Sequence, residues 1–280
     1  MKKINFKIKN VKLAFAILII LAFILLLLYY HFVLSPSFAK NNFANQMIEI
    51  SDENEDTIFS IQKVLLYSSA NAIDNSDNQS LENINISQYT DLSIYLNNSE
   101  SSSELTEQNT IKELYIDNIT LTTNLEHGTK ILNYKNALNF GKYTNIEKPA
   151  NNRIDFKIIN TNEENENHNY DEPTFYTDCS NPITLGFLNK DILTNYSVTD
   201  DMKTVSFNGK ILKEANINLD DIKPTLNFTI HIVNNSNQKF AYNMKLDIDL
   251  NDANGGINNG YVFRGKTTSG NEYRFFKETL

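Results

Sequence analysis

An uninterrupted apolar segment, residues 13–34, follows a lysine-rich start in this 280-residue chain. A helix rises about 1.5 Å per residue, so about 20 apolar residues cross a hydrocarbon core of about 30 Å. The segment has that length and contains no Asp, Glu, Lys or Arg. Pro36 ends the helical pattern, because proline lacks an amide hydrogen and disfavours helical geometry in the residue before it. The sequence therefore predicts a transmembrane helix over residues 13–34.

The charges beside this segment predict its orientation. Five of the twelve residues that precede it are lysines: Lys2, Lys3, Lys7, Lys9 and Lys12. The positive-inside bias puts residues 1–12 in the cytoplasm and everything after the helix outside. A cleaved signal peptide is the alternative, because Ser37-Phe38-Ala39 has small residues where a signal peptidase reads them. Apolar regions of signal peptides usually run only about 7–15 residues, so we expect an uncleaved, single-pass anchor.

Composition restricts the setting further. Cys179 is the only cysteine, so the chain forms no intramolecular disulfide, whereas extracellular eukaryotic domains of this size usually contain several. The high content of Asn, Ile and Lys, without tryptophan, is typical of an AT-rich bacterium. The net charge is −9, and without the five lysines the remaining 20 basic and 34 acidic residues give −14. A surface this acidic repels nucleic acid, so nucleic-acid binding is excluded.

Beyond residue 34 the pattern is mainly β. We expect a juxtamembrane helix or linker at 35–56, a first β domain at 57–160, an acidic linker or loop at 161–173, and a C-terminal β-sandwich domain at 174–280. The polar segment 161–173 contains almost nothing that could be buried, although one long exposed loop within a single domain would read the same way. The predicted fold class is a transmembrane helix followed by one or two antiparallel, immunoglobulin-like β-sandwich domains.

The clearest strand signal lies near the C-terminus. Apolar residues alternate with polar ones over 226–233 and again over 242–250, which is typical of a hairpin with one buried face. Residues 111–122 predict another strand, whose alternation breaks at Asp117-Asn118 and indicates a bulge. Its expected core residues are Leu114, Ile116, Ile119 and Leu121. Shorter strands are expected at 58–67, 91–96, 154–159, 174–176, 183–188, 205–207, 261–266 and 273–277, and residues 131–143 are ambiguous.

Cys179 is the candidate nucleophile. A membrane anchor followed by a β fold with one cysteine resembles the sortase transpeptidases. In that family the cysteine ends a strand with the pattern Thr-Leu-x-Thr-Cys, and its thiolate is paired with a histidine and an arginine. His127 lies upstream, but the next arginine is the distant Arg264. Phe175 and Asp178 stand at the two threonine positions of the motif. Asp178 also raises the pKa of the neighbouring thiol. We therefore interpret Cys179 as a small buried residue and expect no catalytic site.

Two further patterns suggest ligands. Asp247, Asp249 and Asn251 space oxygen ligands as calcium loops do, but an EF-hand would need Gly and Glu where Asp252 and Asn258 stand. We expect a solvated strand end there, and a looser inter-strand calcium site stays open. Residues 111–122 contain YIDNI and so resemble the YIDNI-L strand of jelly-roll carbohydrate-binding modules, which implies glycan binding. No tryptophan is present to stack on sugars, but 14 tyrosines could replace it.

The histidines do not indicate a metal site. No two of them lie at metal-ligand spacing; they are His31, His127, His168 and His231. We therefore predict no metal, cofactor-binding or catalytic residues.

The best function class is a non-catalytic, membrane-anchored binding or scaffolding protein outside the cytoplasm of a bacterium. It would contact the bilayer through residues 13–34 and a protein partner or cell-wall component outside. A wall-binding module and, further off, a sortase-like enzyme are the alternatives. A wall binder predicts exposed tyrosines on one sheet face, an enzyme predicts an exposed Cys179 near a histidine, and a scaffold predicts an exposed sheet edge or apolar patch.

Overall fold

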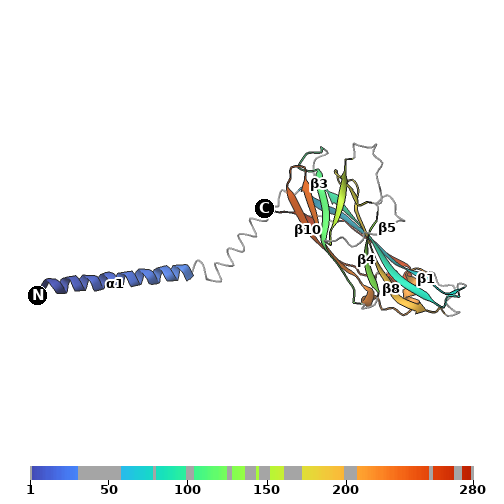
Figure 1. The fold of residues 1–280 in the computed structure, drawn as a ribbon, viewed down its shortest axis with the longest axis horizontal. Coiled ribbons are helices and arrows are strands. Elements are labelled where there is room, and N and C mark those ends of the chain that lie inside the picture. The colour runs from blue at the N-terminus through green and yellow to red at the C-terminus, as the bar shows by residue number, and fades with distance from the viewer. Residues whose placement is uncertain are drawn as a thin grey trace. The chain divides into compact units, whose positions relative to one another are not determined.

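A computed structural model shows the chain as two compact units, Met1–Asp56 and Thr57–Leu280 (Figure 1). Each unit is described by itself. The structure describes residues 2–30, 58–77, 80–98, 104–124, 128–135, 143–144, 152–160, 172–198, 207–251, 255–267 and 273–278. The predicted juxtamembrane segment, 35–56, lies outside these residues.

Helix α1 (Lys2–Tyr29) contains the first part of the predicted span. From Leu13 to Tyr30 all side chains are exposed, and the long apolar ones lie on every side of the helix. Within the described residues, no helix reaches the length and hydropathy of a membrane span. The predicted span continues past Tyr30 into residues outside the described part, and the transmembrane helix stays a prediction.

Residues 58–278 form two six-stranded sheets, so this part of the chain is mainly β, as predicted. Sheet 1 has the order β11 (Tyr261–Thr267), β1 (Ser60–Asp74), β2 (Ile84–Asn97), β8 (Ile183–Tyr196), β4 (Thr129–Lys135) and β5 (Tyr143–Thr144). Sheet 2 has the order β12 (Phe276–Lys277), β10 (Lys239–Asp247), β9 (Thr225–Asn234), β3 (Ile111–Thr122), β6 (Ile154–Ile159) and β7 (Thr174–Tyr176). Among the strand pairs of the described residues, β6 and β7 alone run parallel.

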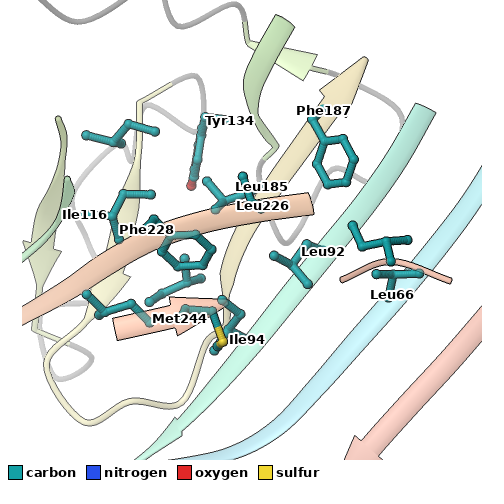
Figure 2. Packing of buried hydrophobic residues seen from close by; sticks show 14 of the residues in the cluster. Leu66, Leu92, Ile94, Ile116, Tyr134, Leu185, Phe187, Leu226, Phe228 and Met244 are labelled. Carbon is teal, nitrogen blue, oxygen red and sulfur yellow. The ribbon is translucent and has the colours of Figure 1, made fainter. Parts of the chain in front are cut away.

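The inner faces of the two sheets share one hydrophobic core. Leu92 and Leu185 of sheet 1 belong to the same buried cluster as Ile116 and Phe228 of sheet 2 (Figure 2). Burial of branched and aromatic side chains from both sheets removes apolar surface from water, which is the main stabilising contribution in a fold of this kind. Three short helices add buried side chains to this core: α3 (Lys210–Glu214), α4 (Leu219–Ile222) and the 3₁₀ helix η4 (Gly256–Asn259).

The predicted hairpin is confirmed as β9 and β10. These strands pair antiparallel from Thr225↔Asp247 to Val233↔Lys239. The alternating apolar residues of β9 are all buried, namely Leu226, Phe228, Ile230 and Ile232. A strand with one buried face requires this period of two.

The bulge in β3 is also confirmed. Its register with β9 shifts between Asp117 and Thr120, and Asn118 adopts a positive φ of 52°. Asparagine tolerates this left-handed conformation better than most residues. Of the four predicted core residues, Leu114 and Ile116 are buried, whereas Ile119 and Leu121 beyond the bulge are partly buried.

The predicted division into domains at 57–160 and 174–280 is corrected by the sheet topology. In sheet 1, β2 pairs with β8, and in sheet 2, β3 pairs with β9, so strands from both sides of 161–173 complete each sheet. Residues 57–280 are therefore one compact unit. A polar stretch between strands does not separate domains when the strands on its two sides pair with each other. Residues 161–171, and 205–206 of the strand predicted at 205–207, lie outside the described residues.

Candidate functional site

The outer face of sheet 1 carries aromatic side chains on three neighbouring strands. Leu66 of β1 and Val262 of β11 point into the core, so the residues next to them in sequence point outward. On β2, the buried Gln88 and Thr90 flank an outward residue in the same way. We call the four outward rings the aromatic face: Tyr67, Tyr89, Tyr261 and Phe263.

These rings contact one another across the strands. The Tyr67 ring stacks on that of Tyr261, with centroids 5.5 Å apart, and lies 6.1 Å from that of Tyr89. Phe263 is the direct cross-strand partner of Tyr67. Tyr261 and Phe263 remain 57 % and 59 % exposed, whereas Tyr67 and Tyr89 are half-buried. Clustered exposed aromatic side chains mark interaction surfaces more often than scattered ones do.

The Tyr89 phenol is neutral at physiological pH, and the carboxylate of Asp91, the cross-strand partner of Tyr67, lies beside it. Burial raises the pKa of Tyr89 to about 12, and a hydrogen bond with Tyr67 adds to the rise. Beneath the rings, Ser69 is buried, and its hydroxyl donates to the carbonyl oxygen of Gly260 at 2.6 Å. This bond ties β1 to the turn that precedes β11. This part of sheet 1 therefore offers apolar rings and tyrosine hydroxyls, with the Asp91 carboxylate beside them, on a fixed backbone.

The aromatic face ends at a sheet edge. β11 pairs with β1 from Lys63↔Thr267 to Ser69↔Tyr261, and no strand among the described residues pairs with its other side. An edge strand presents backbone donors and acceptors to which another chain can add a strand. Here the edge lies directly beside two exposed rings.

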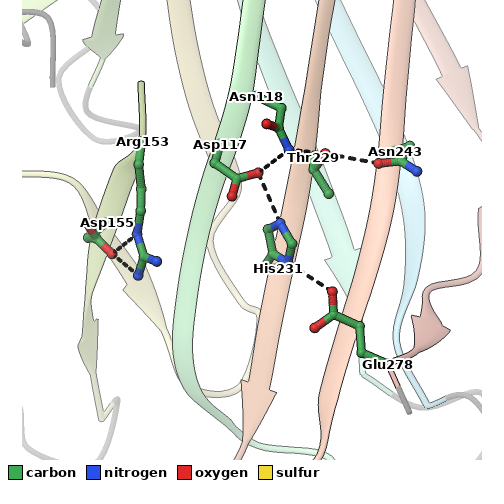
Figure 3. A network of polar contacts seen from close by, with 8 residues as sticks. All are labelled: Asp117, Asn118, Arg153, Asp155, Thr229, His231, Asn243 and Glu278. Carbon is green, nitrogen blue, oxygen red and sulfur yellow. Dashed lines mark hydrogen bonds and ion pairs between the residues drawn. The ribbon is translucent and has the colours of Figure 1, made fainter. Parts of the chain in front are cut away.

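The outer face of sheet 2 has a different character. The Arg153 guanidinium lies 3.5 Å from the centre of the Tyr115 ring, and Tyr115 stacks on His231 with centroids 4.5 Å apart. His231 Nε2 lies 3.0 Å from Asp117 Oδ1, and Arg153 Nε donates to Asp155 at 2.7 Å. Figure 3 shows these polar contacts of His231 and Arg153. Burial raises the pKa of Tyr115. These side chains bind one another and so stabilise the sheet.

The segment that resembles a carbohydrate-binding module lies within this second face. Tyr115 is covered on one side by Arg153 and on the other by His231. The amide of Asn118 donates to Asp117 at 3.0 Å, and lies 3.4 Å from the Thr229 hydroxyl. The ring that the resemblance would assign to sugar stacking therefore has both faces occupied by protein.

Cys179 lies in the turn after β7 and belongs to the core. Its side chain is buried, its amide donates to the Tyr176 carbonyl oxygen at 3.0 Å, and its φ is 61°. Burial, together with the charge of Asp178, raises the pKa of the thiol far above its usual range. A nucleophilic cysteine needs an accessible thiolate, and this environment disfavours one. His127, the proposed partner, lies outside the described residues.

The candidate calcium ligands face different partners. Asp247 accepts a hydrogen bond from the Thr225 hydroxyl at 2.9 Å, whereas Asp249 lies 3.4 Å from the guanidinium of Arg264. A hydrogen bond from the Asn251 amide and the charge of Arg264 lower the pKa of Asp249. Among the described residues, no group of three His, Cys, Asp or Glu side chains is placed to hold a metal ion.

The aromatic face was missed by the sequence reasoning. A local signal existed, because Tyr261-Val262-Phe263 alternates outward rings with a buried residue in a strand that the sequence predicted. The pairing of β1 with β11 brings Tyr67 beside these rings, and strand patterns alone do not specify that pairing. Comparisons with protein families, with curated proteins and with solved structures found no match to this chain.

Proposed function

We propose that this chain is a non-catalytic, single-pass membrane protein of a bacterial envelope that binds another envelope component through the aromatic face. Its N-terminus lies in the cytoplasm and its β unit outside. The observation that carries the binding function is the cluster of four outward rings beside the edge of β11, which no strand of the described residues covers. A folded protein rarely leaves such a cluster exposed without a partner.

The membrane anchor is supported by residues 13–34 and by the lysines before them. A helix that is apolar on all sides needs an apolar environment on all sides. The apolar side chains of α1 are exposed, and a lipid bilayer would cover them. The fold is proposed to be immunoglobulin-like in the broad sense. Two sheets around one core support this class, although the strands here outnumber the roughly seven to nine of its typical members.

A protein partner is the first candidate for the bound component. Tyrosine and phenylalanine are enriched in the cores of protein interfaces, and an edge strand gives an extended segment of a partner a row of backbone hydrogen bonds. The anchor would keep the domain near the membrane, where it could hold other envelope proteins together.

A cell-wall glycan is the second candidate. Three of the four rings are tyrosines, which offer both an apolar face and a hydroxyl that donates and accepts hydrogen bonds. Hydroxyls beside stacked rings suit the mixed surface of a sugar.

A site-specific cross-link tests both candidates. The full-length chain would carry a photoreactive phenylalanine analogue at Phe263 in living cells, and products would be identified by mass spectrometry. Phe276, on β12 of sheet 2, is the matched control because it is also a phenylalanine and is 58 % exposed. A recurring protein product at Phe263 but not at Phe276 supports the scaffold, and wall fragments support glycan binding. Equal products at both positions, or none, would overturn the assignment of the site.

The predicted orientation needs its own measurement. Added protease should digest the β unit of intact, wall-stripped cells and leave a membrane-bound fragment that contains the lysines. Protection of the β unit until the membrane is opened would show that the orientation is wrong.

A further inference from the structure

The edge of sheet 1 beside the aromatic face carries several basic side chains. Pairing with β1 places Arg264, Lys266 and Arg274 along this edge, and Lys63 of β1 lies next to it. Asp249 lies 3.4 Å from the Arg264 guanidinium and offsets one of these four charges. Beyond its first five lysines the chain has 20 basic and 34 acidic residues, a net charge of −14. This basic edge is therefore a local exception on an acidic protein.

The side chains of β11 alternate between the two sides of the strand. Tyr261 and Phe263 belong to the aromatic face, whereas Arg264 and Lys266 lie on the same side as the buried Val262. All residues of β11 except Val262 are exposed. The edge strand thus offers rings on one side and cations on the other.

Uncharged oxygens help to hold the two cations of β11 in position. Arg264 donates to the carbonyl oxygen of Asn251. Lys266 Nζ donates to the hydroxyl of Tyr273 and lies 4.7 Å from the centre of its ring. A carbonyl or a hydroxyl oxygen orients a cation without neutralising its charge. The edge therefore keeps its positive character.

The backbone of this edge suits an added strand. On the side of β11 away from β1, no strand of the described residues pairs with it. In an antiparallel sheet, every second residue of an edge strand directs its N–H and C=O groups away from the sheet. An extended segment that bonds to these groups places its side chains alternately beside the rings and beside the cations.

The charges around β11 select the sequence of such a segment. Beside Arg264 and Lys266, acidic side chains gain charge-assisted hydrogen bonds. Beside Tyr261 and Phe263, apolar side chains cover ring surface, and the Asp91 carboxylate on β2 disfavours acidic ones. A second copy of β11 is disfavoured, because it would bring like cations together.

We infer that β11 accepts, as an added strand, an extended segment of a partner protein in which apolar residues alternate with aspartate or glutamate. This inference rests on the proposed function, because it names the class of partner that the aromatic face binds. The acidic character of the rest of the chain repels such a segment from other surfaces, and the basic edge attracts it. The backbone hydrogen bonds then set its register.

Peptide binding to the full-length chain in detergent micelles tests this inference. The probe is a fluorescein-labelled peptide in which valine alternates with glutamate, and its affinity is measured by fluorescence anisotropy at low salt. A peptide with lysine in place of glutamate should bind about tenfold more weakly, as expected for two exposed charge pairs. Equal affinity of the two peptides would overturn the inference, as would the absence of binding.

Two further peptides separate strand addition from attraction by charge alone. One has the same composition but groups its valines and glutamates in two blocks, and the other carries methyl groups on two adjacent backbone nitrogens. The first loses the alternation, and the second loses backbone hydrogen bonds on both of its edges. Each should bind about fivefold more weakly than the alternating peptide. Binding equal to that of the alternating peptide would contradict an added strand.

Two double variants test the position of the site. Arg264→Gln combined with Lys266→Gln should lower the affinity for the alternating acidic peptide about tenfold. Lys239→Gln combined with Lys245→Gln makes the same change in net charge on β10 and should leave the affinity unchanged. Circular dichroism would establish that both are folded. An equal loss from the two double variants would overturn the assignment to β11.

The photoreactive analogue at Phe263 separates this inference from the proposed function. It should form a product with the alternating peptide, and the analogue at Phe276 should not. If Phe263 captures an envelope component in cells while the acidic and lysine peptides bind equally, only the inference about β11 is wrong. If Phe263 captures no component in cells, the proposed function itself is wrong.

Discussion

The outer faces of the two sheets follow the same strand periodicity but treat their aromatic side chains in opposite ways. On sheet 1, Tyr261 and Phe263 are more than half exposed. Tyr261 stacks on Tyr67, and Phe263 lies opposite Tyr67 on the neighbouring strand. On sheet 2, Tyr115 is closed between Arg153 and His231, and its neighbours form ion pairs. The face of sheet 1 leaves apolar ring surface exposed to a partner, whereas the side chains on the face of sheet 2 pair with one another.

This contrast separates binding from stability. An exposed ring contributes little to folding because its surface stays in contact with water, but it contributes fully to a partner that covers it. A ring covered by other side chains contributes to folding but offers little surface to a partner. Substitutions on the two faces should therefore have effects on different measurements.

The largest effect on stability is expected from a substitution in the core that the two sheets share. Phe228→Ala should lower the free energy of unfolding by about 3–5 kcal/mol, because it removes a buried ring between the sheets. Denaturation by guanidinium, followed by circular dichroism and by tyrosine fluorescence, should show one coincident transition. Phe263→Ala, on the exposed face, is the control and should change stability by no more than about 0.5 kcal/mol. Two separate transitions would contradict a single core.

Binding should respond to the aromatic face alone. Tyr67→Ala and Tyr261→Ala should each reduce the yield of the cross-linked product at Phe263 about tenfold, as expected for central aromatic residues of an interface. Tyr115→Ala on sheet 2 should leave that yield unchanged once the variant is shown to be folded. An equal loss from Tyr115→Ala would remove the distinction between the faces.

Stability should respond to the network on sheet 2. Asp117→Asn should cost about 1–2 kcal/mol, because Asp117 is partly buried and pairs with both His231 and Asn118. Thermal or chemical unfolding measures the loss, and the cross-linking yield at Phe263 is the control. Unchanged stability with reduced binding would mean that sheet 2 carries the interaction surface.

The last prediction concerns Tyr89, one of the two half-buried rings of the aromatic face, at high pH. Tyrosine ionises near pH 10 in an unfolded chain, but the folded protein raises the pKa of Tyr89 to about 12. The unfolded state therefore releases a proton first, and the resulting loss of stability grows as the pH rises from 10 to 12. Tyr89→Phe should lose stability less steeply over this range, as measured by urea denaturation at several pH values. An identical slope would show that Tyr89 is exposed to solvent.

Sequence reasoning was accurate where the controlling interactions are local. The hairpin of β9 and β10 follows from alternation within 226–250, and the bulge follows from its interruption at Asp117-Asn118. The division at 161–173 was corrected because it depended on which strands share a core. The aromatic face was missed for the same reason, since Tyr67 and Tyr261 meet only through the pairing of β1 with β11.

The amino-acid sequence by itself determined the apolar segment and its lysines, the strand periodicity, and the absence of an intramolecular disulfide. These are properties of composition and of short-range backbone geometry. The tertiary structure decided that there is one core, that Cys179 lies within it, and that some tyrosines are covered while others are open. The physical reason is that burial depends on side chains far apart in the chain, and a period of two shows only that a face is buried, not what covers it.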